Sequence, residues 1–191
     1  MVTERVPEGF VRALDGFEAV LAAVSADRWL SPSPCEGWAA VDVAGHVTAG
    51  LLVIEMRAAG RPLPQDDPDW REVAGGDPLA SWRAVRARMT AELVRPGALD
   101  RRVALAFGEA TVREWVEEYP LELLVHTWDL ARASGQAVVL DADLVRSALE
   151  TAGRMAPRGR EAGMVGPESA IAEGAGDQAR LLALFGRDPS A

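Results

Sequence analysis

Two histidines and a few carboxylates are the residues whose types and spacing could do chemistry in this sequence. Glu122 lies four positions before His126, and Asp129 lies three positions after it. At about 100° per residue, these three side chains fall within roughly 60° of one another on a helix. A carboxylate and an imidazole one helical turn apart can hold the same metal ion. The spacing therefore indicates a candidate metal site on this helix.

The second histidine, His46, is the only other imidazole in the chain. It lies in a predicted helix among small residues, including Gly45 and Gly50, which leave room for a neighbouring group or a ligand. Together with Glu122 and His126 it makes a two-histidine, one-carboxylate set that suits Zn²⁺, Ni²⁺ or Fe²⁺. Trp38 and Trp128 lie near these positions along the sequence and are candidates to shape a pocket.

Each of these residues also has an ordinary structural interpretation. A Glu–His pair at this spacing is common on helix faces without a metal, and His46 could be a hydrogen-bonded residue of the core or surface. Asp129 is expected to orient a ligand or to pair with Arg132 rather than to bind a metal directly. Cys35 is interpreted as a structural thiol in a loop, with a nucleophilic role as the alternative.

Composition and charge exclude several other classes of function. The 191 residues contain 20 Lys and Arg against 29 Asp and Glu, which gives a net charge of −9 and argues against nucleic-acid partners and anionic membrane surfaces. The single cysteine rules out a disulfide framework, and the N-terminus does not resemble a signal peptide. We therefore expect a cytoplasmic protein that acts on a small-molecule substrate.

The elements that must position these residues are predicted to be helices. Apolar spacing, prolines and glycines place helices over residues 9–30, 40–59, 78–94 and 112–134. A fifth helix is capped by Asp141 or Asp143 and fades near Gly153, and a last short helix covers 177–185.

The stretches between these helices are predicted to be irregular, apart from one short strand or hairpin near 102–111. Residues 61–78 form a long connection with at most a turn or two, and residues 156–176 form a surface segment. Such a helical bundle with a long crossover commonly places polar sites between facing helices. We expect a single domain over residues 1–191, with a core of about 8–155 and a C-terminal extension of about 156–191.

Three strings carry a resemblance to a known family: SPSPCEGWAAVDVAGHV, LELLVHTWDLARASGQ and LLALFGRDP. With them, the chain resembles the DinB-like superfamily of metal-binding four-helix bundles. More narrowly, it resembles the actinobacterial branch related to the N-terminal domain of mycothiol-dependent maleylpyruvate isomerase. The resemblance covers nearly the whole chain and implies an all-α, four-helix bundle with a long crossover between helices 2 and 3 and extra C-terminal helices.

The resemblance also implies a ligand set and a chemistry. The family's metal ligands fall on His46, Glu122 and His126, with Zn²⁺ as the first expectation and Ni²⁺ or Fe²⁺ as alternatives. Ala39 stands where many relatives carry Thr or Ser, so the capping box with Asp42 lacks its hydroxyl half. The chain has no room for the separate C-terminal domain of the isomerase, so isomerisation of maleylpyruvate itself is not the expected activity.

Three functions are consistent with these residues. The first is a metal-dependent enzyme that activates a low-molecular-weight thiol of the mycothiol type, for S-transfer to a small electrophile or for its isomerisation. The second is a metal-dependent hydrolase that uses the same site, with Glu118 as a candidate general base. The third is a non-catalytic protein that binds a small molecule or a metal. The sequence does not fix the oligomeric state, and a homodimer is a candidate assembly because relatives of this family often dimerise.

Overall fold

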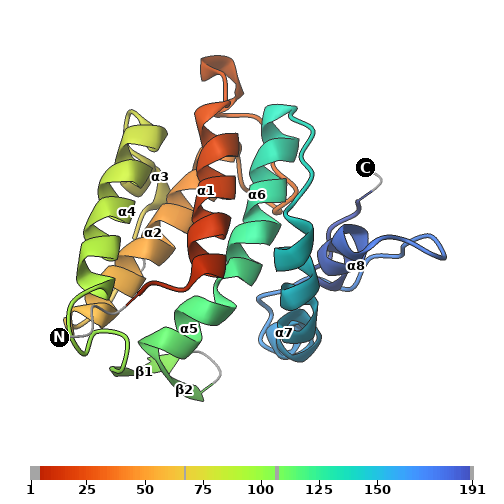
Figure 1. The fold of residues 1–191 in the computed structure, drawn as a ribbon. Coiled ribbons are helices and arrows are strands. Elements are labelled where there is room, and N and C mark those ends of the chain that lie inside the picture. The colour runs from red at the N-terminus through yellow and green to blue at the C-terminus, as the bar shows by residue number, and fades with distance from the viewer. Residues whose placement is uncertain (1–4, 67, 106–107, 190–191) are drawn as a thin grey trace.

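Four helices pack around a shared apolar core in the computed structural model, which describes residues 5–66, 68–105 and 108–189. They are α1 (Glu8–Ala22), α2 (Ala40–Ala58), α4 (Pro78–Leu93) and α6 (Pro120–Ser134). Each contacts two of the others, in the order α1, α6, α2, α4 and back to α1 (Figure 1). This arrangement confirms the all-α helical bundle expected from the sequence.

The remaining elements lie around this bundle. They are the 3₁₀ helix η1 (Ala26–Arg28), α3 (Trp70–Ala74), the strands β1 (Arg102–Leu105) and β2 (Gly108–Thr111), α5 (Val112–Glu118), α7 (Ala142–Glu161) and α8 (Asp177–Leu184). The strands pair antiparallel as the predicted hairpin, and α3 is the short turn of helix expected within the long crossover. On the blue side of Figure 1, α7 packs against α6, and α8 packs against α7.

The first helix is shorter than predicted because its apolar face runs out. Its buried positions follow helical spacing and end at Leu21, and nearly all of the next residues are exposed. Without an apolar face to bury, the chain leaves the helix after Ala22 and forms η1 before the loop that carries Cys35. The predicted helix over 9–30 is therefore two elements joined by a short connection.

The helix predicted over 112–134 is also two elements, and the reason is Pro120. Proline has no backbone N–H and fits the first turn of a helix, so α5 ends at Glu118 and α6 begins at Pro120. The break places Glu122 in the first turn of α6, where the positive end of the helix dipole favours a carboxylate.

The fifth helix is longer than predicted and continues through Pro157 to Glu161. Asp141, one of the two candidate caps, accepts hydrogen bonds from the backbone N–H groups of Asp143 and Leu144. Burial of small residues on one face, among them Ala152 and Ala156, offsets the cost of the internal proline. The division into a core of about 8–155 and an extension of about 156–191 stays a prediction.

None of the helices within residues 5–66, 68–105 and 108–189 is long and apolar enough to span a lipid bilayer.

Candidate metal centre

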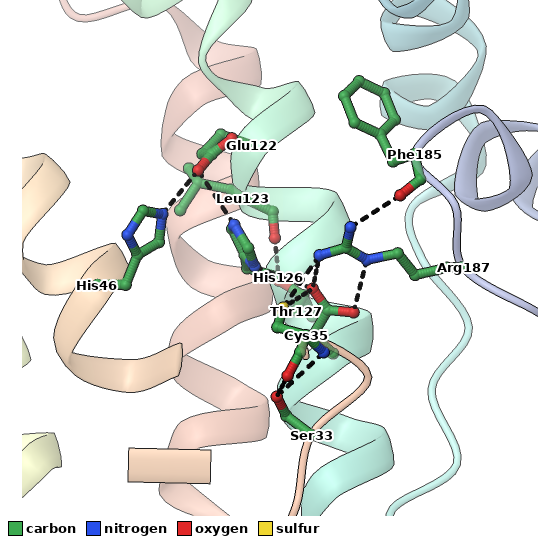
Figure 2. A network of polar contacts seen from close by, with 10 residues as sticks. Ser33, Cys35, His46, Glu122, Leu123, His126, Thr127, Phe185 and Arg187 are labelled. Carbon is green, nitrogen blue, oxygen red and sulfur yellow. Dashed lines mark hydrogen bonds and ion pairs between the residues drawn. The ribbon is translucent and has the colours of Figure 1, made fainter. Parts of the chain in front are cut away.

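Three donor groups meet where α2 faces α6. His46 lies on α2, and Glu122 and His126 lie one turn apart on α6. The Nε2 atoms of the two imidazoles lie 3.0 and 3.1 Å from the same carboxylate oxygen, Glu122 Oε1 (Figure 2). One donor atom from each of the three residues lies within 4.8 Å of the others. The helices therefore bring together the ligand set that the sequence predicts.

The position of His46 depends on the small residues around it in α2. Gly45 has no side chain, and a Cβ there would lie 1.9 Å from the backbone oxygen of Trp70. α3 can therefore rest directly on the backbone of α2. One turn after His46, Gly50 similarly admits the hydroxyl of Tyr119, which a Cβ would meet at 1.9 Å. The room that the sequence predicts beside His46 is filled by two aromatic residues.

Two tryptophans stand against the histidines. The Trp38 ring lies 4.9 Å from the His46 ring and is nearly parallel to the His126 ring at 6.0 Å. Trp70 lies 5.1 Å from His46 and 4.2 Å from Trp38, measured between ring centroids. Trp128, the other candidate to shape a pocket, is instead buried in the core with the guanidinium of Arg132 over its ring.

The second ring nitrogen of His126 faces a buried carboxylate. His126 Nδ1 lies 2.9 Å from Asp129 Oδ2, and Asp129 is fully buried. Burial by itself lowers the pKa of His126, but Glu122 and Asp129 outweigh burial and raise that pKa well above its ordinary value. The imidazole is therefore a cation that donates from both nitrogens when no metal is bound, and a metal at Nε2 would replace one proton.

The side of the site at Glu122 is open to solvent. The Glu122 side chain is 42% exposed and the His46 side chain 29%, whereas His126 is 8% exposed. Partial burial raises the pKa of Glu122, but the imidazoles of His126 and His46 outweigh it and hold that pKa well below its ordinary value. Glu122 is therefore ionised at neutral pH, as a metal ligand must be.

A polar network lies behind His126, away from Glu122 (Figure 2). Arg187, from the segment that follows α8, donates to both carboxylate oxygens of Asp129 at 2.7 and 3.1 Å. The Cys35 thiol donates to Asp129 Oδ2 at 3.2 Å, and Arg187 Nη2 lies 3.0 Å from the Cys35 sulfur. Burial raises the pKa of Asp129, but His126 and Arg187 lower it to about 2.

Cys35, His126 and Asp129 also have donor atoms within 4.8 Å of one another. This second group is a poor cation site, because the guanidinium of Arg187 already lies against the sulfur and the carboxylate. A metal ion there would meet a fixed positive charge at close range. We therefore place the candidate metal centre at His46, Glu122 and His126.

The sequence predictions for the residues around the site have mixed outcomes. Asp129 lies 2.9 Å from His126 Nδ1 and forms an ion pair with Arg187, and its role in orienting His126 stays a prediction. Cys35 is predicted to be a structural thiol in a loop, with a nucleophilic role as the alternative. The structure places it in the network behind His126. Arg187 was missed as a site residue, although it lies in the string LLALFGRDP, because no local pattern connects it with residues 58 and 152 positions away.

Comparisons with known proteins identify the family of this chain. The sequence matches the family described as the mycothiol maleylpyruvate isomerase N-terminal domain over residues 10–131. The chain belongs to this family. The matched region contains all three predicted ligands and ends before Arg187.

Curated relatives of this family member are proteins of Mycobacterium tuberculosis described as uncharacterized. One, present in two strains, is 32% identical over 141 residues, which cover 74% of each chain. A second is 30% identical over 96 residues, which cover 42% of this chain and 37% of the relative. No solved structure matches the chain significantly.

Proposed function

We propose that this chain is a divalent-metal enzyme that activates a low-molecular-weight thiol for transfer to, or isomerisation of, a small electrophilic substrate. The observation that carries the proposal is the meeting of His46, Glu122 and His126, whose donor atoms lie within 4.8 Å. Zn²⁺ is the proposed ion, with Ni²⁺ and Fe²⁺ as alternatives, because two imidazoles and one carboxylate suit all three. The thiol of mycothiol type is proposed from the family alone.

The donor set and its surroundings fit a catalytic ion better than a structural one. Three protein ligands leave coordination positions free, whereas structural zinc sites use four. The exposed side of Glu122 gives a small molecule access to those positions. An ion held there would act as a Lewis acid that lowers the pKa of a bound thiol or water.

The chain's own residues have distinct roles in this proposal. Asp129 accepts a hydrogen bond from His126 Nδ1–H and so directs Nε2 toward Glu122. Trp38 and Trp70 cover His46 with apolar rings, which exclude water from that side of the site. A substrate would approach past Glu122, where the side chain is exposed.

The hydrolase alternative depends on Glu118 as the general base, and the position of Glu118 does not suit that role. Glu118 ends α5, and its carboxylate pairs with Arg154 of α7 at 2.9 Å. It lines a groove between α1, α6 and α7 that contains none of the three proposed ligands. The structural arrangement therefore counts against hydrolysis with Glu118 as the general base.

The first test is the metal content of protein purified without a metal-affinity tag, measured by mass spectrometry. We expect about one equivalent of Zn, Ni or Fe in the wild type. We expect its loss in His46→Ala, because the two remaining ligands would hold a metal ion only weakly. Circular dichroism of both proteins checks that the variant is folded. An absence of metal in the wild type after reconstitution would contradict the proposal and favour a metal-free binding protein.

The second test follows the conversion of a small electrophile in the presence of mycothiol, measured as thiol consumed for S-transfer and as isomerised product for isomerisation. We expect turnover by the metal-loaded wild type and none by His126→Ala. Tight binding of mycothiol without turnover would favour the non-catalytic binding protein. Equal turnover by His126→Ala would contradict the metal-dependent mechanism.

A further inference from the structure

The C-terminal segment reaches the metal centre through one side chain, Arg187. Its guanidinium forms a two-pronged contact with Asp129: Nε donates to Oδ1 at 3.1 Å and Nη2 to Oδ2 at 2.7 Å (Figure 2). The Arg187 side chain is 15% exposed and that of Asp129 is fully buried. A planar guanidinium that grips both oxygens fixes the plane of the carboxylate as well as its position.

The oxygen that Arg187 Nη2 grips is also the one that faces the metal centre. Asp129 Oδ2 receives Arg187 Nη2 and the thiol of Cys35, and it lies 2.9 Å from His126 Nδ1. The opposite nitrogen of the same ring, Nε2, points to Glu122. The direction of Nε2 therefore depends on the carboxylate plane, and the carboxylate plane depends on Arg187.

Arg187 is itself held rigidly. Its Nη1 donates to the backbone oxygen of Phe185 at 2.8 Å, and its backbone N–H donates to Leu182 of α8 at 3.1 Å. The preceding residue, Gly186, has φ +75, and a Cβ there would lie 2.8 Å from the Pro167 oxygen. The turn after α8 thus needs a glycine, and it presents the guanidinium in one orientation.

We propose that Arg187 is a positioning residue of the metal centre, which fixes Asp129 so that the His126 ring presents Nε2 to Glu122 and His46. This inference rests on the proposed function, because it assigns a further residue to the same centre. It extends that centre beyond residues 10–131, the region that matches the family. The C-terminal segment is then part of the site and not only a covering of α7.

The test compares Arg187→Gln and Arg187→Lys with the wild type, first without metal. A ring N–H that is held against a carboxylate exchanges slowly with water, so the His126 Nδ1–H proton should give a sharp NMR signal. We expect this signal to broaden or disappear in Arg187→Gln. Lysine keeps the charge but cannot grip both oxygens, so Arg187→Lys should exchange faster than the wild type and remain folded. If Arg187→Gln does not fold, the exchange of the His126 Nδ1–H proton is compared between Arg187→Lys and the wild type alone.

The second readout is the dissociation constant for Zn²⁺, measured by competition with a chromophoric chelator. We expect it to rise about 10–100-fold in Arg187→Gln and by less in Arg187→Lys. Arg180→Gln is the matched control: this arginine lies on α8, is exposed and pairs only locally, with Asp177 among the contacts described. Its zinc affinity should equal that of the wild type.

Two results would overturn the inference. One is an unchanged Nδ1–H signal and zinc affinity in the Arg187 variants, even if their unfolding midpoint falls, because that result assigns Arg187 a purely structural role. The other is an equal change in Arg180→Gln. Failure of the wild type to bind zinc would contradict the proposed function instead, and the Nδ1–H signal of the metal-free protein would still decide the role of Arg187.

Discussion

The two ring nitrogens of His126 face different carboxylates, and the difference in their surroundings separates two roles. Glu122, at Nε2, is 42% exposed and shares one oxygen with His46. Asp129, at Nδ1, is fully buried and bonded to Arg187. An exposed carboxylate can exchange its imidazole partners for a metal at low cost, whereas a buried one must keep its hydrogen bonds. We therefore propose Glu122 as the metal ligand and Asp129 as the residue that orients the ring.

We predict that Glu122→Gln weakens zinc binding. The amide keeps the shape of the side chain but loses its charge, so zinc affinity should fall by more than the roughly 10–100-fold typical of a changed outer partner. Glu118→Gln makes the same chemical change four positions earlier, where the carboxylate pairs with Arg154. Competition titrations on both variants check this, and equal zinc affinities would contradict the assignment.

α3 is a short helix whose stability depends on its contact with α2. Asp69 caps it by accepting from two backbone N–H groups, and Arg71 forms a two-pronged contact with Asp42 of α2 at 2.6 and 2.9 Å. A helix of five residues is not stable alone, so these contacts and the bare backbone at Gly45 hold it in place. Trp70 reaches His46 only because α3 is seated there.

We therefore predict that Gly45→Ala disturbs the site through α3. The new Cβ would overlap the backbone of Trp70, which cannot yield as a side-chain tip can. Unfolding free energy should fall by about 1–3 kcal/mol, and the tryptophan fluorescence of the folded protein should change. Chemical denaturation followed by fluorescence measures both effects.

Gly153→Ala is the matched control for this substitution. Gly153 is an exposed residue of α7, and a Cβ there would meet nothing within 4 Å. Alanine should stabilise the protein by about 0.5–1 kcal/mol, because it restricts the unfolded chain and suits a helix. A Gly45→Ala protein as stable as Gly153→Ala would show that α3 does not rest on the α2 backbone.

Charged contacts between helices tie the whole bundle together, and Glu18 of α1 is the clearest case. Its carboxylate accepts from the indole N–H of the buried Trp82 and from Arg83 and Arg86, all on α4. Partial burial raises the pKa of Glu18, but these three donors outweigh it and hold that pKa below its ordinary value of 4.5. Because the folded state prefers the ionised form, the contacts stabilise the bundle only while Glu18 is ionised.

The pH dependence of stability follows from this sign. The contribution of Glu18 is complete above a pH of about 4.5 and is lost as the pH falls through its lower pKa in the folded state. Glu18→Gln should lose about 1–2 kcal/mol of unfolding free energy at pH 7, since Arg83 is exposed and its contact is screened. Its stability should then fall less steeply below pH 4.5 than that of the wild type.

Urea denaturation at pH 7 and at several values below pH 4.5 measures this difference. Glu150→Gln removes a carboxylate from an exposed position of α7 and serves as the control. Its stability curve should follow the wild type at each pH. Parallel pH profiles for Glu18→Gln and the wild type would contradict the role given to Glu18.

The sequence by itself determined the helices that local patterns encode. Apolar spacing, prolines and glycines predicted the four bundle helices, the hairpin and the last short helix. The i, i+4 spacing of Glu122 and His126 was sufficient to place both side chains on one helix face. Two errors concern local signals, because the apolar face of the first helix ends at Leu21 and Pro120 divides a predicted helix. A third is tertiary, since packing against the bundle carries α7 past Gly153 to Glu161.

Only the tertiary structure decided which distant residues meet. His46 was proposed as the third ligand because the chain has one other imidazole, but its 3.0 Å approach to Glu122 depends on how α2 packs against α6. Cys35, Asp129 and Arg187 each lie in one of the three strings that carry the family resemblance, but those strings do not show that the three side chains meet. The physical reason is that helix periodicity acts over a few residues, whereas burial of a charged side chain requires a partner wherever the fold supplies one.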